Sequence, residues 1–215
     1  MTDREPVNIM GVIAFPNPNK DERVIRFIDS EYHTLFTIKD GESIVITRFD
    51  GEKMVFPCKY IDDCHVCIGN SAYHICEFAE MQERNGNTYV PRTPKISAEI
   101  GTYEIYQIPA TADVDYYFRP YAEAKGKLQN ADYQRSYAGM FAKENSLEDL
   151  WAKHNSDHRP FAHRMRSMSV SDIVVLTQGG KKTAYYTDSV GFKEVPEFLV
   201  QQRTQKKHKE RGEAR

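Results

Sequence analysis

The stretch TLFTIKDGESIVITRFDGEKMVFPCKYI, residues 34–61, alternates β-branched and aromatic runs with Asp-Gly pairs. Asp40-Gly41 separates the first run from the second, and Asp50-Gly51 separates the second from the third. Asp-Gly between such runs favours a hairpin, because both central residues of a type I′ turn need positive φ. The stretch therefore predicts a meander of three strands.

A helix is predicted after this meander, where the hydrophobic period changes at Gly69-Asn70. In SAYHICEFAEMQERNG, four side chains fall at helical spacing: Ile75, Phe78, Ala79 and Gln82. Ser71 or Asn70 can serve as the N-cap and Gly86 as the C-cap. On the N-terminal side of the meander, NIMGVIAF (Asn8 to Phe15) predicts one short strand that ends at PNPNK. These residues make a first unit in which the helix packs on the strands.

A second unit of similar size follows a stretch rich in proline and small polar residues, VPRTPKISAEIG. YEIYQI (103–108) predicts a strand, ADYQRSYAGMF an extended segment, and SVSDIVVLTQGGKKTAYYTDSVGF two strands around Gly179-Gly180. NSLEDLWAKHN predicts a helix with Ser146 as N-cap, and VPEFLVQQ begins a last helix at Pro196. The apolar face of the NSLEDLWAKHN helix is expected to be Leu147, Leu150 and Trp151.

The chain thus divides into residues 1–90, a linker at 91–101, a second domain at 102–200 and a tail at 201–215. We expect an α+β protein with two small units, each a mainly antiparallel sheet with one or two packed helices. No apolar run approaches the roughly 20 residues of a membrane span, and the N-terminus MTDREPVNIMG lacks a secretory h-region. A cytoplasmic location without a membrane partner is therefore expected, and cytoplasmic thiols stay reduced.

The charge is unevenly distributed along the chain. The net charge is −2, but residues 201–215 carry 6 Lys/Arg against 2 Asp/Glu. Such a basic tail is typical either of an arm that binds an acidic partner or of a solvated helix end. Four tail residues are candidates for partner binding: Lys206, Lys207, Lys209 and Arg211.

All four cysteines lie within CKYIDDCHVCIGNSAYHIC, residues 58–76. A tetrahedral zinc site usually needs two closely spaced pairs of ligands, and only Cys64 and Cys67 form a C-x-x-C. If residues 65–68 are a strand, alternation turns these two thiols to opposite faces of the sheet, which opposes chelation. No thioredoxin-like pattern surrounds them, and Cys76 is expected to act as a small buried hydrophobe. Structural thiols are the favoured interpretation, with zinc bound by these cysteines, His65 and His74 as the alternative.

A second cluster lies in DHRPFAHRMRS, before the closing hairpin. It could form a clamp for phosphate or carboxylate, because Arg supplies paired donors and His can gain a charge; the alternative is a solvated loop. The candidate partner-binding residues here are His158, Arg159, His163, Arg164 and Arg166.

No catalytic motif is found. SMSVSDIVVL pairs Ser171 with Asp172 but lacks the G-x-S-x-G elbow of a hydrolase, so these residues are expected to form the turn that begins a strand. TQGGKKT joins two strands and does not open a helix, so it predicts a hairpin turn and not a phosphate loop. We therefore expect a protein that is not an enzyme, with no catalytic residues, no metal and no cofactor.

The second unit resembles the YodL-like domain from about Tyr103 to Leu199. The resemblance rests on YEIYQI, DYYFRPY, NSLEDLWAKHN, MSVSDIVVL and TAYYTDSVGFKEVPEFL. Through YIDDCHVCIGNSAYHICEFAEMQERNG, the first unit is similar to a large polyvalent protein-associated domain. Such domain pairs occur in proteins carried by conjugative elements and phages of gut Firmicutes. These proteins are thought to enter the recipient with the DNA and protect it from host defence.

The resemblance implies a non-enzymatic mobile-element accessory protein that acts by macromolecular binding, as a counter-defence inhibitor of host restriction or CRISPR nucleases. Its partner would be a host defence protein or nucleoprotein complex, with nucleic acid contacted through the basic tail. The alternative is a nucleic-acid-binding conjugation accessory protein. A zinc-dependent or hydrolytic activity, and interference with bacterial cell-shape filaments, are further hypotheses.

Overall fold

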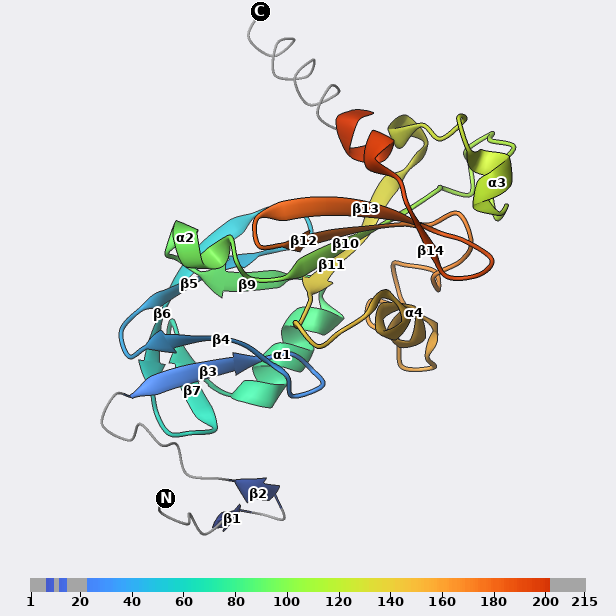
Figure 1. The fold of residues 1–215 in the computed structure, drawn as a ribbon. Helices are drawn as coiled ribbons and strands as arrows, with labels where there is room; N and C mark the ends of the chain where they lie inside the picture. The colour runs from blue at the N-terminus through green and yellow to red at the C-terminus, as the bar shows by residue number, and fades with distance from the viewer. Residues whose placement is uncertain (1–6, 10–11, 15–22, 202–215) are drawn as a thin grey trace, which may run out of the picture.

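The computed structural model describes residues 7–9, 12–14 and 23–201 (Figure 1). Near the N-terminus, β1 (Val7–Ile9) pairs antiparallel with β2 (Val12–Ala14). The prediction of one strand over Asn8 to Phe15 is therefore wrong, because this segment supplies two short strands that pair with each other.

The N-terminal half contains two antiparallel sheets. One is the pair β3 (Val24–Ile28) and β4 (Thr34–Lys39). The other has the strand order β8-β7-β6-β5-β9. Its strands are β5 (Ser43–Thr47), β6 (Lys53–Tyr60), β7 (His65–Ile68), β8 (Ser71–His74) and β9 (Thr88–Pro91).

The predicted three-strand meander is correct only in its second hairpin. β5 and β6 pair across Asp50-Gly51, but β4 pairs with β3 and not with β5. Phe36 of β4 stacks on Phe27 of β3 with ring centroids 4.9 Å apart, so aromatic packing holds β4 to β3. Of each Asp-Gly pair only the glycine has positive φ, +86° at Gly41 and +95° at Gly51, so neither turn is type I′.

Helix α1 (Ile75–Arg84) lies against these sheets. Its buried residues are those predicted from the helical spacing: Ile75, Phe78, Ala79 and Gln82. The predicted start is wrong, because residues 71–74 form β8 and the N-cap is His74, whose Nδ1 accepts from the Cys76 N–H at 3.3 Å. Gly86 follows the helix with φ +63°, a left-handed conformation that glycine adopts without strain.

The segment predicted as a linker, residues 91–101, is ordered and partly structured. Pro91 is the last residue of β9, and α2 (Pro94–Ser97) follows it. Ile100 is buried in the N-terminal core. The connection between the halves is therefore packed against the first half before the second half begins.

The C-terminal half is built on one antiparallel sheet with the order β11-β10-β12-β13-β14. Its strands are β10 (Thr102–Gln107), β11 (Gln134–Met140), β12 (Ile173–Gln178), β13 (Lys181–Thr187) and β14 (Phe192–Glu194). Its helices are α3 (Tyr121–Ala124), the 3₁₀ turn η1 (Asn130–Asp132), α4 (Leu147–Asn155) and the helical residues 196–201. Gly179 and Gly180 both have positive φ at the β12–β13 turn, which confirms the predicted hairpin.

α4 confirms the predicted N-cap but corrects the predicted apolar face. Ser146 and Asp149 form a capping box, in which each side chain accepts from the backbone N–H of the other. Leu150 is buried, but Trp151 is 36% exposed and His154 is fully buried in its place. The helix is turned so that its polar His154 faces the sheet, where Tyr103 provides a partner.

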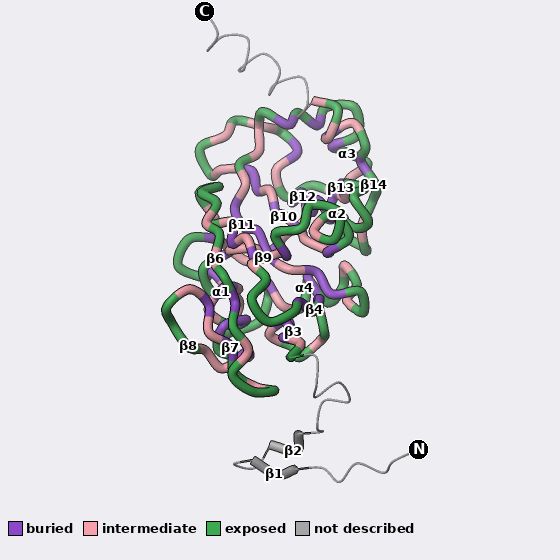
Figure 2. Tube along the Cα trace, turned by 90° about the vertical axis from the view of Figure 1, so that its left-hand side faces the viewer, coloured by how far each residue is buried: buried purple, intermediate pink, exposed green. Residues whose placement is uncertain are grey.

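The two halves pack directly on each other. The Tyr137 hydroxyl of β11 donates to the Glu83 carbonyl of α1 at 2.9 Å, and Phe49 packs against Phe161 at 4.8 Å. Figure 2 shows buried stretches at β11, β9 and α1, where the halves meet. The molecule is broadly α+β and dominated by antiparallel sheets. Among the residues that the structure describes, none of the helices has the length and apolar character needed to cross a membrane.

Candidate functional site

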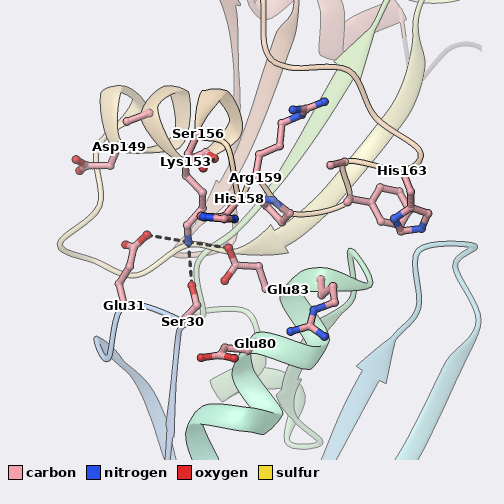
Figure 3. A pocket seen from close by; sticks show the side chains of 15 residues that line it. Ser30, Glu31, Glu80, Glu83, Asp149, Lys153, Ser156, His158, Arg159 and His163 are labelled. Carbon is pink, nitrogen blue, oxygen red and sulfur yellow. Dashed lines mark hydrogen bonds and ion pairs between the residues drawn. The ribbon is translucent and has the colours of Figure 1, made fainter.

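A groove of about 900 Å³ opens where α1, α4 and the loop after α4 meet (Figure 3). We call it the junction groove. It is lined by segments from both halves: the β3–β4 loop (Ser30, Glu31), α1 (Glu80, Glu83, Arg84), α4 with its C-cap (Asp149, Ala152, Lys153, Ser156) and the loop residues 158–163. The groove therefore exists only because the halves are docked.

Lys153 is the central side chain of the junction groove. Its Nζ lies 3.0 Å from Glu31 Oε1 and 3.0 Å from Glu83 Oε1, and it donates to Ser30 Oγ at 3.3 Å (Figure 3). The side chain is only 17% exposed. Burial opposes the charged form, yet the carboxylates of Glu83 and Glu31 raise the pKa of Lys153 above its ordinary value. The Lys153 ammonium thus ties α4 to both segments of the N-terminal half.

One end of the junction groove is cationic. The loop after α4 contributes His158, Arg159 and His163, and the last turn of α1 contributes Arg84. Within the described part of the chain, none of these four side chains pairs with a carboxylate. Arg159 Nε is buried and lacks a hydrogen-bond partner there. An unsatisfied buried N–H is costly, so this end of the groove suits a ligand that supplies acceptor oxygens.

The opposite end of the junction groove carries carboxylates. Asp149 and Glu31 lie to the left of Lys153 in Figure 3, whereas His163 lies to the right. Hydrogen bonds from the Ser146 backbone and hydroxyl hold the pKa of Asp149 below its usual range, so Asp149 is ionised. In all, four carboxylates and three Lys or Arg side chains line the groove. It is a surface of both signs, not a basic patch.

A buried polar cluster lies beneath α4. His154 is fully buried, and its Nε2 lies 2.8 Å from the Tyr103 hydroxyl. Desolvation lowers the pKa of His154 to about 3, so the ring is neutral at physiological pH. Burial also raises the pKa of Tyr103 and Tyr137 well above the ordinary value. These shifted groups are enclosed by protein and support the packing of α4 on the sheet.

The structure separates the predicted cluster of the DHRPFAHRMRS loop. His158, Arg159 and His163 do line one groove. Arg164 packs over the Phe161 ring at 5.7 Å and does not line the groove. Arg166 turns inward and forms a two-point ion pair with the buried Asp172. The tail candidates Lys206, Lys207, Lys209 and Arg211 lie outside the described residues.

Arg166 and Asp172 form a structural cluster that begins the closing hairpin. Asp172 Oδ2 accepts from Arg166 Nη1 at 2.9 Å and from Gln107 Nε2 at 2.8 Å. Burial raises the pKa of Asp172 to about 6 despite these donors. Arg166 also packs over the stacked rings of Tyr117 and Phe118. Ser171 and Asp172 precede β12, as predicted for a turn that begins this strand.

The cysteines do not gather into one site. In β7 the buried residues are Val66 and Ile68, whereas His65 is exposed, which confirms the predicted alternation. Cys58 is the fully buried cysteine, and the other three, including Cys76, are partly buried, which corrects the expectation for Cys76. Desolvation raises the pKa of Cys58 to about 11 and also raises that of Cys76, so both thiols stay protonated. Whether zinc binds here stays a prediction.

Within the described ranges, the one group of three metal-ligating types is Asp29, Glu31 and His33, whose ligand atoms lie within 4.8 Å of one another. Several of their ligand atoms already have partners within the protein. Asp29 Oδ1 accepts from two backbone N–H groups, Asp29 Oδ2 pairs with His33 Nδ1 at 3.0 Å, and Glu31 pairs with Lys153. This group orders the β3–β4 loop at the edge of the junction groove.

The part of the chain that matches a known protein family begins at the start of β10. Residues 102–198 match the YodL-like domain. This match begins at the first residue of β10 and ends in the C-terminal helical segment, so the YodL-like domain supplies α4 and the loop of the groove. The comparison shows no large polyvalent protein-associated domain in the preceding residues. No curated protein and no solved structure matches the chain.

The two side chains of the central ion pair, Lys153 and Glu83, are among the groove residues that were not predicted as functional from the sequence. Lys153 lies on a helix whose charged residues resemble an ordinary solvated face, and Glu83 lies on another helix 70 positions earlier. In the sequence, Lys153 directly precedes His154, which is buried in the structure. This position would predict a partly buried lysine only if the buried face of α4 were already known.

Proposed function

We propose that this protein is a non-enzymatic accessory protein of a mobile element that acts by binding a host defence protein through the junction groove. The observation that carries the proposal is the groove itself, in which unpaired charged side chains from both halves meet. The setting is what the sequence resemblances imply; of the two, the comparisons find the YodL-like domain at residues 102–198.

The shifted titratable groups support binding in preference to catalysis. His154 and Asp172 have strongly shifted pKa values, a property that often marks catalytic groups. Both are fully buried: His154 Nε2 contacts the Tyr103 hydroxyl, and Asp172 contacts Arg166 and Gln107, while His154 Nδ1 has no hydrogen-bond partner among the described residues. Within the described residues they therefore behave as structural groups.

The proposal can be tested by measuring plasmid establishment. A restricting recipient strain that expresses the protein should accept unmodified plasmid DNA more efficiently than a recipient without it. The variant Arg84→Glu/Arg159→Glu should lose this effect, because it reverses the cationic end of the groove. Arg26→Glu/Arg92→Glu is the matched control, since both arginines are exposed and lie outside the groove. Equal establishment with and without the protein, in strains with either restriction or CRISPR nucleases, would contradict the proposal.

A nucleic-acid-binding conjugation accessory is the second candidate, favoured by the 6 Lys/Arg against 2 Asp/Glu in residues 201–215. Binding through these residues predicts an affinity for duplex DNA that falls steeply with salt concentration. The affinity should disappear when residues 201–215 are deleted and persist in Arg84→Glu/Arg159→Glu. A DNA affinity that survives the deletion would rule out the tail as its source.

A further inference from the structure

We infer that the junction groove binds a short extended protein segment that carries both an acidic and a basic side chain, and that it does not bind a nucleic acid strand. This inference rests on the proposed binding function and specifies the chemistry of the partner. It follows from the distribution of charge inside the groove.

The acidic residue of the partner would bind at the cationic end. Arg84, Arg159 and the two loop histidines come from different segments and all line the groove. The described protein leaves Arg159 Nε buried and without an acceptor. A carboxylate is the protein group that best completes a guanidinium, because its two oxygens match paired N–H donors.

The basic residue of the partner would bind at the end that carries carboxylates. Glu31 and Glu83 are neutralised by Lys153, whereas Asp149 has no Lys or Arg partner within the described structure. Asp149 is ionised and directed at solvent from the first turn of α4. A Lys or Arg of the partner can therefore pair with Asp149.

The same charges disfavour a nucleic acid in the groove. A nucleic acid strand carries a negative charge at each phosphate, and binding requires that several successive phosphates meet Lys or Arg. Here four carboxylates face three Lys or Arg side chains, one of which, Lys153, is already paired twice. A strand lying along the groove would place phosphates against Glu80 and Asp149. An extended peptide avoids this conflict because its residues can differ in charge from one end to the other.

A random-peptide display library provides the test. Selection on the full chain should yield peptides that contain both an acidic and a basic residue in a constant order. The affinity of a selected peptide should fall about tenfold or more in Arg84→Glu/Arg159→Glu, as is typical for loss of a close charge pair at an interface. A second selection on that variant should yield peptides that have lost the acidic residue. Arg26→Glu/Arg92→Glu should select the same peptides as the unchanged protein.

Two outcomes would overturn the inference. One is a library that yields no peptide whose binding depends on the groove. The other is a short DNA duplex that binds and loses its affinity in Arg84→Glu/Arg159→Glu, which would make the groove a nucleic acid site. Circular dichroism of each variant shows whether it is folded, and Asp149→Asn provides an independent change at the end that carries carboxylates. Plasmid establishment that depends on the groove while the peptide test fails would leave the proposed function intact and reject only this partner chemistry.

Discussion

His154 shows how one residue can dominate the pH dependence of stability. It is neutral in the fold because desolvation lowers its pKa from 6.5 to about 3. Between these values the unfolded chain binds a proton that the folded chain does not, so stability falls as the pH falls below 6.5. The expected slope is about 1.4 kcal/mol per pH unit for this single group.

Asp172 changes stability with pH in the opposite direction, so its contribution must be separated from that of His154. Its pKa is raised to about 6, so its contribution to stability is fully present at low pH and is lost as the pH rises through 6. The measurement is therefore the difference in unfolding free energy between the unchanged protein and His154→Phe. Because Asp172 contributes equally to both proteins, this difference should decrease as the pH is lowered from 6.5 to 4. A difference independent of pH would show that His154 is protonated in the fold.

Gly139 is a residue at which close packing excludes any side chain. A Cβ there would lie 2.8 Å from the Tyr137 ring and 2.9 Å from the Tyr103 ring, both of which are fully buried. Gly139→Ala should lower the unfolding free energy by about 1–3 kcal/mol, since neither ring can move freely. Gly126→Ala is the control. A Cβ at Gly126 meets no atom within 4 Å, so this substitution should lower the unfolding free energy by only about 1 kcal/mol, which comes from the φ of +80°. Equal losses in urea denaturation would argue against the ring contact.

At the scale of elements, helical spacing and turn chemistry predicted most of what the structure contains. The four buried residues of α1, the Ser146 cap of α4 and the Gly179-Gly180 hairpin all depend on local sequence. The pairing of β4 with β3 depends instead on Phe27 and Phe36, which are separated by a loop, so the Asp40-Gly41 turn did not reveal it. Residues 71–74 pair with β7 although their spacing also suits a helix. Strand pairing in the folded protein, and not local sequence, determines the structure of β4 and of residues 71–74.

The capping box of α4 allows a direct test at this scale. Ser146→Ala removes the oxygen that accepts from the Asp149 N–H at 3.1 Å, and it also removes the hydroxyl that donates to the Asp149 carboxylate at 2.8 Å. The expected loss is about 1 kcal/mol of unfolding free energy. Ser156→Ala, at the other end of the same helix, should change it by less than about 0.5 kcal/mol. If the two variants were equally stable in urea denaturation, the cap would contribute nothing measurable.

At the scale of the whole molecule, the candidate site could be predicted only in part. His158, Arg159 and His163 were candidates because they cluster in sequence. Arg84, Glu83 and Lys153 become neighbours of these residues only when α1 and α4 dock, and no local pattern encodes that contact. Arg166 was a candidate by sequence proximity, but the buried Asp172 directs it inward. The loop residues of the groove could therefore be predicted from the sequence, whereas the contribution of α1 to the groove could not.

Docking through Lys153 predicts that the two halves unfold together. The sequence has one tryptophan, Trp151 in α4, so its fluorescence reports the C-terminal half, whereas circular dichroism reports both halves. Lys153→Met leaves the partly buried Glu83 and the exposed Glu31 without a cation and should cost about 2 kcal/mol, between the values for exposed and buried pairs. Both probes should shift to lower urea by the same amount, because the ammonium stabilises the contact between the halves. Lys182→Met is the matched control. Its side chain is 48% exposed and its Nζ lies 3.5 Å from Glu104 Oε2, so its loss should cost less than about 0.5 kcal/mol. A shift in fluorescence alone would mean that Lys153 stabilises only its own half, and that the junction groove can open without unfolding either half.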